Sequence, residues 1–303
     1  MPLLEVENLH VTFSIEGRPL YAVRGVTFHI QEGESVGIVG ESGSGKTAVA
    51  QAIKQLSPGS VSGRLLFRGI PITSSLKEIG MVFQDPMTSL NPTMKIGRQI
   101  GEGLIYHRLA SHKEAKEKAI ELLRLVGIAE PELRVHQYPH EFSGGMRQRA
   151  LIAIALACNP SLLIADELTT ALDGATQLQV LGLIQQLQKR LQMSVLLISH
   201  DFGVIRQSCE RVLVMYAGKI VEQGSIEEVL QHPQHPYTEL LLHSLPEFNQ
   251  EKLKPLASID GSPPDLKTIP EGCSFKERCP YRAIKCNEEP SGPVACWRIR
   301  SPS

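Results

Sequence analysis

Apolar and polar residues alternate along the first part of the chain, and later stretches change between strand-like and helix-like spacing. Alternation over residues 3–15 and 26–30, with a turn at 16–19 between them, predicts an antiparallel pair of strands. Short apolar runs typical of buried parallel strands follow at residues 35–39, 79–83, 162–165 and 194–198. The pattern therefore predicts an α/β fold whose parallel core carries an antiparallel β subdomain.

Helical spacing predicts where further elements lie. Residues 96–133 are polar with apolar residues at helical intervals, which indicates an inserted α-helical subdomain at about 92–160. Past residue 246 the composition shifts to Pro, Lys and Glu, as in a linker. We expect one domain over 1–245, then a linker and a small Cys-rich C-terminal extension over 246–303. Other helices are expected at 48–56, 146–158, 177–191 and from 225, and a hairpin at 211–223.

Charge and hydropathy narrow the class of protein. Lys and Arg number 31 against 32 Asp and Glu, so the formal net charge is -1 and no nucleic-acid partner is expected. Apolar runs stay well short of the roughly 20 residues that a membrane-spanning helix needs. Glu5, Glu7 and Glu16 interrupt the N-terminal stretch, which predicts no signal peptide. A cytoplasmic protein is expected, although docking on a membrane protein leaves no trace in hydropathy.

The stretch G-E-S-G-S-G-K-T at residues 40–47 satisfies the pattern G-x-x-x-x-G-K-[ST] between a strand-like and a helix-like run. Glycines there let successive N–H groups point at phosphate, and the following helix adds its positive end. Lys46 is expected to reach the β- and γ-phosphates and Thr47 to offer its hydroxyl to Mg²⁺. The alternative is a glycine-rich turn that merely joins strand to helix. The predicted phosphate cradle consists of Gly40, Glu41, Ser42, Gly43, Ser44, Gly45, Lys46 and Thr47.

Three predicted strand ends carry side chains suited to phosphate hydrolysis. Gln84 is placed to give an amide oxygen to Mg²⁺ or to attacking water. Asp166 is expected to hold Mg²⁺ through water, and Glu167 to polarise the water that attacks the γ-phosphate. An acidic pair that only favours a helix dipole is the alternative. His200 can donate to the γ-phosphate, although a lone His after a strand is commonly structural.

Two more positions are candidates for nucleotide contacts. Ser143 is a natural N-cap, and Gly144 and Gly145 let a ligand approach the helix N–H groups, which suggests a second anion site. An ordinary capped helix is the alternative. Phe13, at the first hairpin, either stacks on adenine or is a half-buried strand residue.

Four of the six cysteines crowd into the last part of the chain, at Cys273, Cys279, Cys286 and Cys296. In a reducing compartment such crowding favours a metal or cluster over disulfides. The spacings contain no C-x-x-C pair of the sort that zinc ribbons use. An iron–sulfur cluster, structural zinc and unligated thiols all remain open, and Cys158 and Cys209 are expected in the core.

Together these motifs resemble the ATP-binding subunit of an ABC transporter over roughly residues 1–245. The resemblance rests on the P-loop, Gln84, S-G-G-M-R-Q-R at 143–149, L-L-I-A-D-E at 162–167 and I-S-H at 198–200. It is similar in particular to the peptide-importer branch, which serves oligopeptide, dipeptide and sometimes nickel uptake. That similarity lies in the segments G-E-S-G-S-G-K, F-Q-D-P-M-T-S-L-N-P, H-P-Q-H-P-Y-T and G-C-S-F-K-E-R-C-P.

The resemblance implies a P-loop NTPase (RecA-like) core and an ATPase that energises import. It implies Phe13 as the adenine-stacking aromatic, Ser143, Gly144 and Gly145 as the signature, Glu167 as the catalytic base, His200 as the switch residue and Asp173 in a dimer-contacting loop. For the tail it implies a [4Fe-4S] cluster. The cofactors implied are thus ATP, Mg²⁺ and this cluster, with zinc as the alternative.

The same resemblance implies an assembly. A second ATPase subunit, homologous or identical, faces the first head to tail, so that the Ser143 helix covers ATP held by the partner subunit. Two integral membrane permease subunits and an extracellular or periplasmic substrate-binding protein complete the importer. The chain is then peripheral, on the cytoplasmic face of the inner membrane.

Three positions depart from the family pattern. Leu168 replaces the usual Pro after the catalytic Glu, the segment 69–79 is short, and Gly174 follows Asp173 where a bulkier residue is usual. Competing functions are a nickel or metal-chelate importer ATPase, a soluble ABC ATPase acting on nucleic acid or ribosomes, and a P-loop kinase. The near-neutral net charge weighs against an ATPase that acts on nucleic acid or ribosomes. A kinase would leave the signature and His200 without a role.

Overall fold

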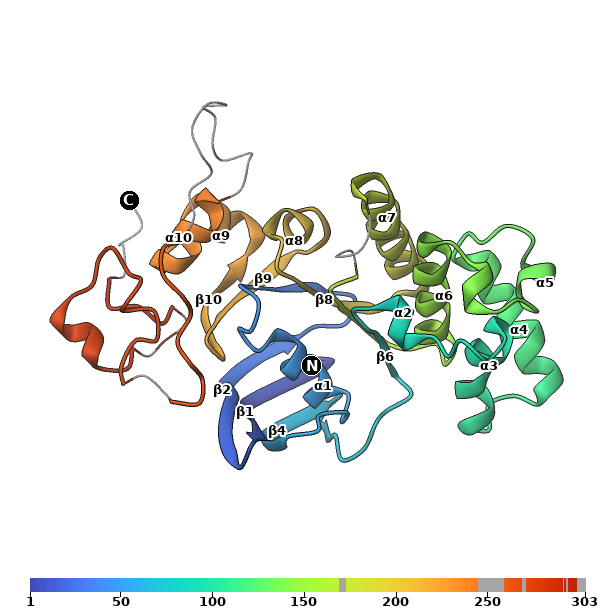
Figure 1. The fold of residues 1–303 in the computed structure, drawn as a ribbon, viewed down its shortest axis with the longest axis horizontal. Coiled ribbons are helices and arrows are strands. Elements are labelled where there is room, and N and C mark those ends of the chain that lie inside the picture. The colour runs from blue at the N-terminus through green and yellow to red at the C-terminus, as the bar shows by residue number, and fades with distance from the viewer. Residues whose placement is uncertain (169–172, 245–258, 269–270, 291, 293, 299–303) are drawn as a thin grey trace. The chain divides into compact units, whose positions relative to one another are not determined.

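The computed structural model describes residues 1–168, 173–244, 259–268, 271–290, 292 and 294–298, and Figure 1 shows their helices and strands. The chain separates into two compact units. The first contains Met1–Gln31, Ser35–Ser74 and Leu197–Ser303, and the second Glu32–Glu34 and Ser75–Leu196. The predicted loop at 169–172 and most of the predicted linker after 246 lie outside the described residues. Within the described ranges, no helix combines the length and apolar character needed to cross a membrane.

An antiparallel sheet opens the first unit, as the alternation predicts. Its strands, in the order β2–β1–β4–β5, are β1 (Leu4–Ile15), β2 (Arg18–Ile30), β4 (Ser60–Phe67) and β5 (Ile70–Pro71). Leu4 lies opposite Ile30 on one side and Phe67 on the other. The pairing with β2 shifts between Val6 and Leu9, and both of these side chains are buried. This bulge keeps the two halves of β1 facing the same core despite the change of spacing.

The first unit also contains the strand that precedes the P-loop. This strand, β3 (Ser35–Val39), is buried throughout and runs parallel to β9 (Arg211–Tyr216), which pairs antiparallel with β10 (Lys219–Ser225). Helix α1 (Lys46–Ile53) starts two residues before the predicted start, because the last P-loop residues form its first turn. The other helices of this unit are α8 (Phe202–Ser208), α9 (Ile226–Gln231) and α10 (Pro236–His243).

The second unit combines buried strands with the predicted helical subdomain. Strands β6 (Ile79–Val82) and β7 (Leu162–Asp166) are parallel neighbours, so their carboxyl ends meet at one edge. Helices α3, α4 and α6 pack on one another (Figure 1). The helices of this unit are α2 (Pro86–Ser89), α3 (Ile96–Tyr106), α4 (His112–Leu125), α5 (Pro131–Arg134), α6 (Gly144–Leu156) and α7 (Gly174–Leu191), with a 3-10 turn at Pro139–Glu141. Strand β8 (Ser194–Ser199) runs from this unit into the first.

Helices α6 and α7, like α1, begin before the predicted residue, and in α6 and α7 a side-chain cap fixes the start. Helix α6 begins directly after Ser143, whose hydroxyl accepts from the Met146 N–H at 3.3 Å. Helix α7 begins directly after Asp173, whose carboxylate accepts from the Thr176 N–H at 3.0 Å. Hydrophobic periodicity marks only the first buried turn, whereas the cap fixes the true start.

The C-terminal module, the described residues between 259 and 298, attaches to the rest of the first unit through an aromatic core. Phe275 is 1% exposed, and its ring centroid lies 5.1 Å from that of Tyr216 and 5.4 Å from that of Tyr237. The Ala295 N–H donates to the Val221 carbonyl on β10 at 2.9 Å. A short 3-10 helix, Ile284–Asn287, lies farther along the module. Apolar packing and backbone pairing therefore both hold the module in place.

Phe275→Ala is expected to destabilise the C-terminal module by about 3 kcal/mol, because it leaves a cavity among three buried rings. Hydrogen exchange of the amides in residues 271–290 measures the loss of protection. Ile284→Ala is the matched control, since that side chain is 91% exposed. Equal protection in the two variants would contradict the aromatic anchor.

Candidate functional site

The P-loop lies between β3 and α1, and two of its glycines are required by their surroundings. A Cβ on Gly40 would lie 2.1 Å from the Met215 carbonyl oxygen. Gly45 has φ +101°, and a Cβ there would lie 2.2 Å from the Ala22 carbonyl oxygen. Any larger side chain at either position would push the loop away from its neighbouring strands. The backbone of residues 40–47 is thus held close to β2 and β9.

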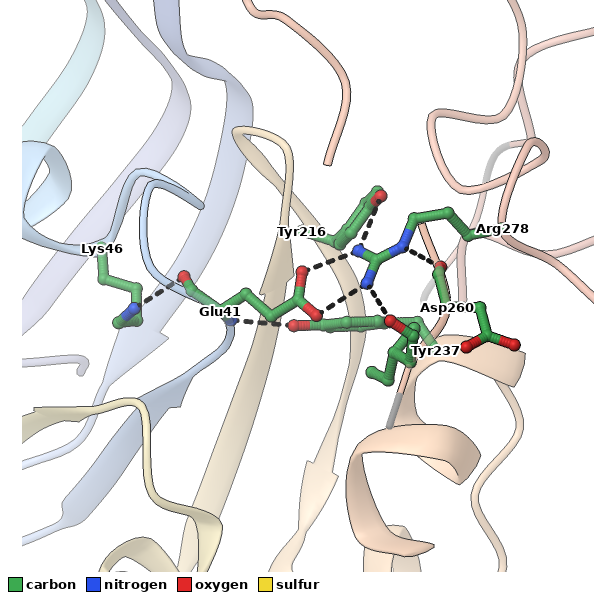
Figure 2. A network of polar contacts seen from close by, with 7 residues as sticks. Glu41, Lys46, Tyr216, Tyr237, Asp260 and Arg278 are labelled. Carbon is green, nitrogen blue, oxygen red and sulfur yellow. Dashed lines mark hydrogen bonds and ion pairs between the residues drawn. The ribbon is translucent and has the colours of Figure 1, made fainter. Parts of the chain in front are cut away.

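Lys46 is folded back over this loop. Its ammonium donates to the Glu41 carbonyl at 3.0 Å (Figure 2). It also donates to the Gly40 carbonyl at 2.8 Å, and the residue is 4% exposed. The residue before α1 is Gly45, which has no side chain to cap the helix, and a helix start of this kind is a common phosphate-binding element. The Ser44 hydroxyl is buried without a hydrogen-bond partner in the described part of the chain. An orphan hydroxyl, a helix start and a lysine at one loop fit a bound polyphosphate.

The two carboxylates of the second unit end strand β7 in different environments. Asp166 is 2% exposed, whereas Glu167 is half-buried and has φ +47°. A non-glycine residue in this left-handed region costs about 1 kcal/mol. The turn directs Glu167 away from the strand while Asp166 stays in the core. One carboxylate is therefore fixed and buried, and the other is accessible to solvent.

Gln84 and Glu167 meet across this sheet edge. The Gln84 side-chain amide donates to the Glu167 carboxylate at 2.7 Å. The contact follows from the parallel pairing of β6 with β7, which brings the two strand ends together. The structure thus brings together two of the residues that the sequence predicts to handle the attacking water.

The predicted signature forms the exposed start of α6. Ser143 and Gly144 are exposed, and a Cβ on Gly144 would meet nothing within 4 Å. Gly145 is half-buried, with Thr176 3.3 Å from where its Cβ would lie. The helix end is therefore open to a ligand, as an anion site requires.

The remaining predicted contacts belong to the first unit. His200 is exposed at the end of β8, directly before Asp201, which caps α8. Phe13 is half-buried on β1 opposite Leu20, and Thr47 lies in the first turn of α1. Each unit thus carries its own set of predicted residues, and their joint action on one nucleotide remains a prediction.

The four clustered cysteines line one cavity of about 330 Å³ in the C-terminal module, called the Cys cavity below. Burial and the neighbouring thiols raise the pKa of Cys273 to about 11. Among the described residues, no group of three or more His, Cys, Asp or Glu side chains is arranged so that it could hold a metal ion. The cavity walls also include His235, Phe275, Tyr281 and Trp297.

His235 is engaged in a hydrogen bond at one ring nitrogen. Its Nδ1 accepts from the Tyr237 N–H at 3.0 Å. Burial lowers its pKa to about 4, so the imidazole is neutral at physiological pH. The Cys cavity therefore offers thiols rather than imidazole to a ligand.

Sequence reasoning missed the residues that hold the P-loop from outside. Arg278 of the C-terminal module contacts Glu41 with two hydrogen bonds, at 2.7 and 3.0 Å, across 237 positions of the chain. The Tyr237 hydroxyl accepts from the Glu41 N–H at 2.8 Å. Periodicity and motif spacing carry no signal for such a contact. Cys158 and Cys209 were predicted in the core and are half-buried, just beyond α6 and α8 respectively.

Comparison with known proteins agrees with this geometry. Residues 23–170 match the ABC transporter family, and residues 221–286 match the family described as oligopeptide/dipeptide transporter, C-terminal region. The second match covers α9, α10 and much of the C-terminal module. Both the nucleotide-binding part and the Cys-rich part of the chain thus have counterparts in known protein families.

Similar chains extend over nearly the whole sequence. The oligopeptide transport ATP-binding protein OppD of Bacillus subtilis (strain 168) is 50% identical over 305 residues, covering 96% of this chain and 85% of its own. The dipeptide transport ATP-binding protein DppD of Haemophilus influenzae is 45% identical, covering 95% and 91%.

A solved structure shares the fold. The ATP-binding cassette MJ0796, in a dimeric post-hydrolysis state bound to ADP and Pi, is similar with a TM-score of 0.65 at 29% identity, covering 74% of this chain and 98% of that one. With its P-loop, its paired strand ends and its open signature helix, the chain belongs to the ABC transporter family, as an ATP-binding subunit of the oligopeptide/dipeptide branch.

Proposed function

We propose that this chain hydrolyses ATP to energise the import of oligopeptides or dipeptides. The observation that carries the peptide assignment is the match of residues 221–286 to the oligopeptide/dipeptide transporter region. It is supported by full-length relatives named for the transport of these substrates. A metal-chelate importer is the second candidate. The cysteine cluster of this region is compatible with import of either peptides or metal chelates.

In the proposed reaction each residue has one task. The N–H groups of residues 40–47 and the Lys46 ammonium bind the phosphates, and Phe13 stacks on the base. Thr47, Gln84 and Asp166 hold Mg²⁺, which when bound neutralises phosphate charge. Glu167 accepts a proton from the attacking water, and its hydrogen bond with Gln84 orients it before catalysis. His200 donates to the γ-phosphate.

The assembly follows from the need for two phosphate-binding helix ends. We infer that Ser143, Gly144 and Gly145 cover the nucleotide of a second ATPase subunit, so that ATP becomes part of the interface. Hydrolysis then separates the subunits. This motion drives two membrane permeases that receive peptide from a binding protein outside the cell, with the ATPases peripheral on the cytoplasmic face of the membrane.

Recovery of intact complexes from cells tests this assignment. Affinity purification of the chain in mild detergent is expected to recover multispanning membrane proteins and a second ATPase. Recovery of ribosomes or DNA in their place would contradict an importer. Uptake of labelled peptide against uptake of nickel, in cells with and without the chain, separates the two cargo classes.

We propose further that the Cys cavity binds a [4Fe-4S] cluster through Cys273, Cys279, Cys286 and Cys296. Four thiols around one cavity match the ligand number of this cluster. The Nδ1 of His235 is engaged with the Tyr237 N–H, which disfavours a mixed Cys and His zinc site through that nitrogen. Binding requires the Cys273 thiol to ionise against its raised pKa, which a bound iron cluster would favour.

Anaerobic purification is expected to yield a protein with broad visible absorbance and equal amounts of iron and acid-labile sulfide. Cys286→Ser should remove most of both, since three thiolates hold the cluster weakly. Cys158→Ser, which changes a cysteine outside the Cys cavity, is the control. Zinc without iron in the anaerobic protein would overturn the cluster assignment.

Glu167→Gln is expected to lower the rate of ATP hydrolysis by at least about 100-fold, because an amide cannot accept the proton of attacking water. Affinity for ATP should stay within about twofold, since the phosphate-binding residues are unchanged. Steady-state hydrolysis and equilibrium nucleotide binding measure the two effects. Glu121→Gln, at an exposed carboxylate on α4, serves as control. Unchanged turnover in Glu167→Gln would exclude Glu167 as the base.

A further inference from the structure

The second residue of the P-loop, Glu41, is held on its backbone by Tyr237 of α10 and on its side chain by Arg278 of the C-terminal module (Figure 2). Its N–H donates to the Tyr237 hydroxyl, and its carboxylate accepts two hydrogen bonds from Arg278. Its carbonyl accepts from the Lys46 ammonium at 3.0 Å. Glu41 therefore stands between the phosphate-binding lysine and the C-terminal module.

The Arg278 guanidinium uses all five of its N–H donors in this position. Two reach the two carboxylate oxygens of Glu41, at 2.7 and 3.0 Å. The others reach the Tyr216 hydroxyl at 3.3 Å and the carbonyls of Asp260 and Ile259 at 2.9 and 3.0 Å. A lysine has one donor centre and could not satisfy this fork.

The pair is largely removed from solvent. The Arg278 side chain is 6% exposed and that of Glu41 is 26% exposed, whereas in the neighbouring Arg282–Glu277 pair the two are 51% and 66% exposed. Removing one member of a buried pair leaves an uncompensated charge, which is costly, whereas exposed pairs contribute little. Arg278 therefore controls the charge at Glu41 in a way that surface pairs do not.

The charge of Glu41 matters because its backbone forms part of the phosphate cradle. A free carboxylate beside a triphosphate would repel the ligand, and the repulsion is strongest where solvent is excluded. Arg278 neutralises that carboxylate and fixes it away from the lysine. The residue following Arg278 is Cys279, and Phe275 packs on Tyr216 and Tyr237. The same short segment therefore lines the Cys cavity and supports the P-loop.

We propose that Arg278 is a positioning residue for ATP binding, which neutralises Glu41 and thereby makes the phosphate cradle depend on a folded C-terminal module. The proposal rests on ATP binding at residues 40–47. It gives the C-terminal module a role in ATP binding, separate from the binding of a cluster in the Cys cavity.

Equilibrium binding of ATP and ADP to the purified full-length chain tests this role. Arg278→Gln is expected to weaken ATP binding about tenfold, the size expected for one charge acting over several ångström in a partly buried site. ADP binding should weaken less, because ADP carries less negative charge. A purely structural role would lower the fraction of active protein and leave the ratio of the two affinities unchanged.

Removing the carboxylate as well is the decisive comparison. The double variant Glu41→Gln with Arg278→Gln is expected to recover most of the ATP affinity that Arg278→Gln alone loses, since no unpaired charge remains. Arg282→Gln, in the same segment, should bind ATP normally. If the double variant binds ATP as weakly as Arg278→Gln alone, the electrostatic role of Arg278 is wrong.

Arg278→Lys keeps the proposal testable where Arg278→Gln does not fold. It retains the positive charge but not the fork, so its loss of ATP affinity should be smaller than that of Arg278→Gln and still be reversed by Glu41→Gln. Normal ATP affinity in Arg278→Lys would overturn the need for the two-pronged contact. Failure of the unaltered chain to bind ATP would refute the ATP site itself, which separates the two claims.

Discussion

The close approach of the P-loop backbone to strands β2 and β9 is the constraint on which the rest of the site depends. Gly40 and Gly45 permit it, because a Cβ at either position would collide with a backbone carbonyl. The approach places Lys46 over the carbonyls of Gly40 and Glu41. A cradle of this kind binds phosphate through fixed dipoles that need no rearrangement. Its geometry must therefore be supported from outside, by packing rather than by the ligand.

That support comes from residues that are distant in the sequence. Met215 and Ala22 pack against the glycines from within the sheets, and Tyr237 and Arg278 hold Glu41 from the C-terminal half. In the second unit, the parallel pairing of β6 with β7 does the equivalent work for Gln84 and Glu167. In both units, rigid strands position groups that act on phosphate or water. Loops between strands and helices carry the chemistry, as is usual in open α/β sheets.

Sequence reasoning identified what depends on local pattern. Buried strands have continuous apolar runs, so 35–39, 79–83 and 162–165 were located nearly to the residue. The motif at 40–47 and the carboxylates of Asp166 and Glu167 were located because they directly follow or end such apolar runs. Helix starts were less accurate, because the caps at Ser143 and Asp173 act before the first apolar turn. The Arg278–Glu41 pair escaped altogether, since it joins residues 237 positions apart and neither residue type is unusual where it stands.

The central claim is that ATP hydrolysis by this chain drives peptide across a membrane. The most direct measurement is peptide accumulation in vesicles that contain the purified complex of this chain with its membrane partners, with peptide-loaded binding protein on the opposite side. We predict accumulation that requires Mg²⁺ and ATP on the side of this chain and stops when Glu167 is replaced by Gln. Steady ATP hydrolysis by the complete complex without any movement of peptide would contradict the account.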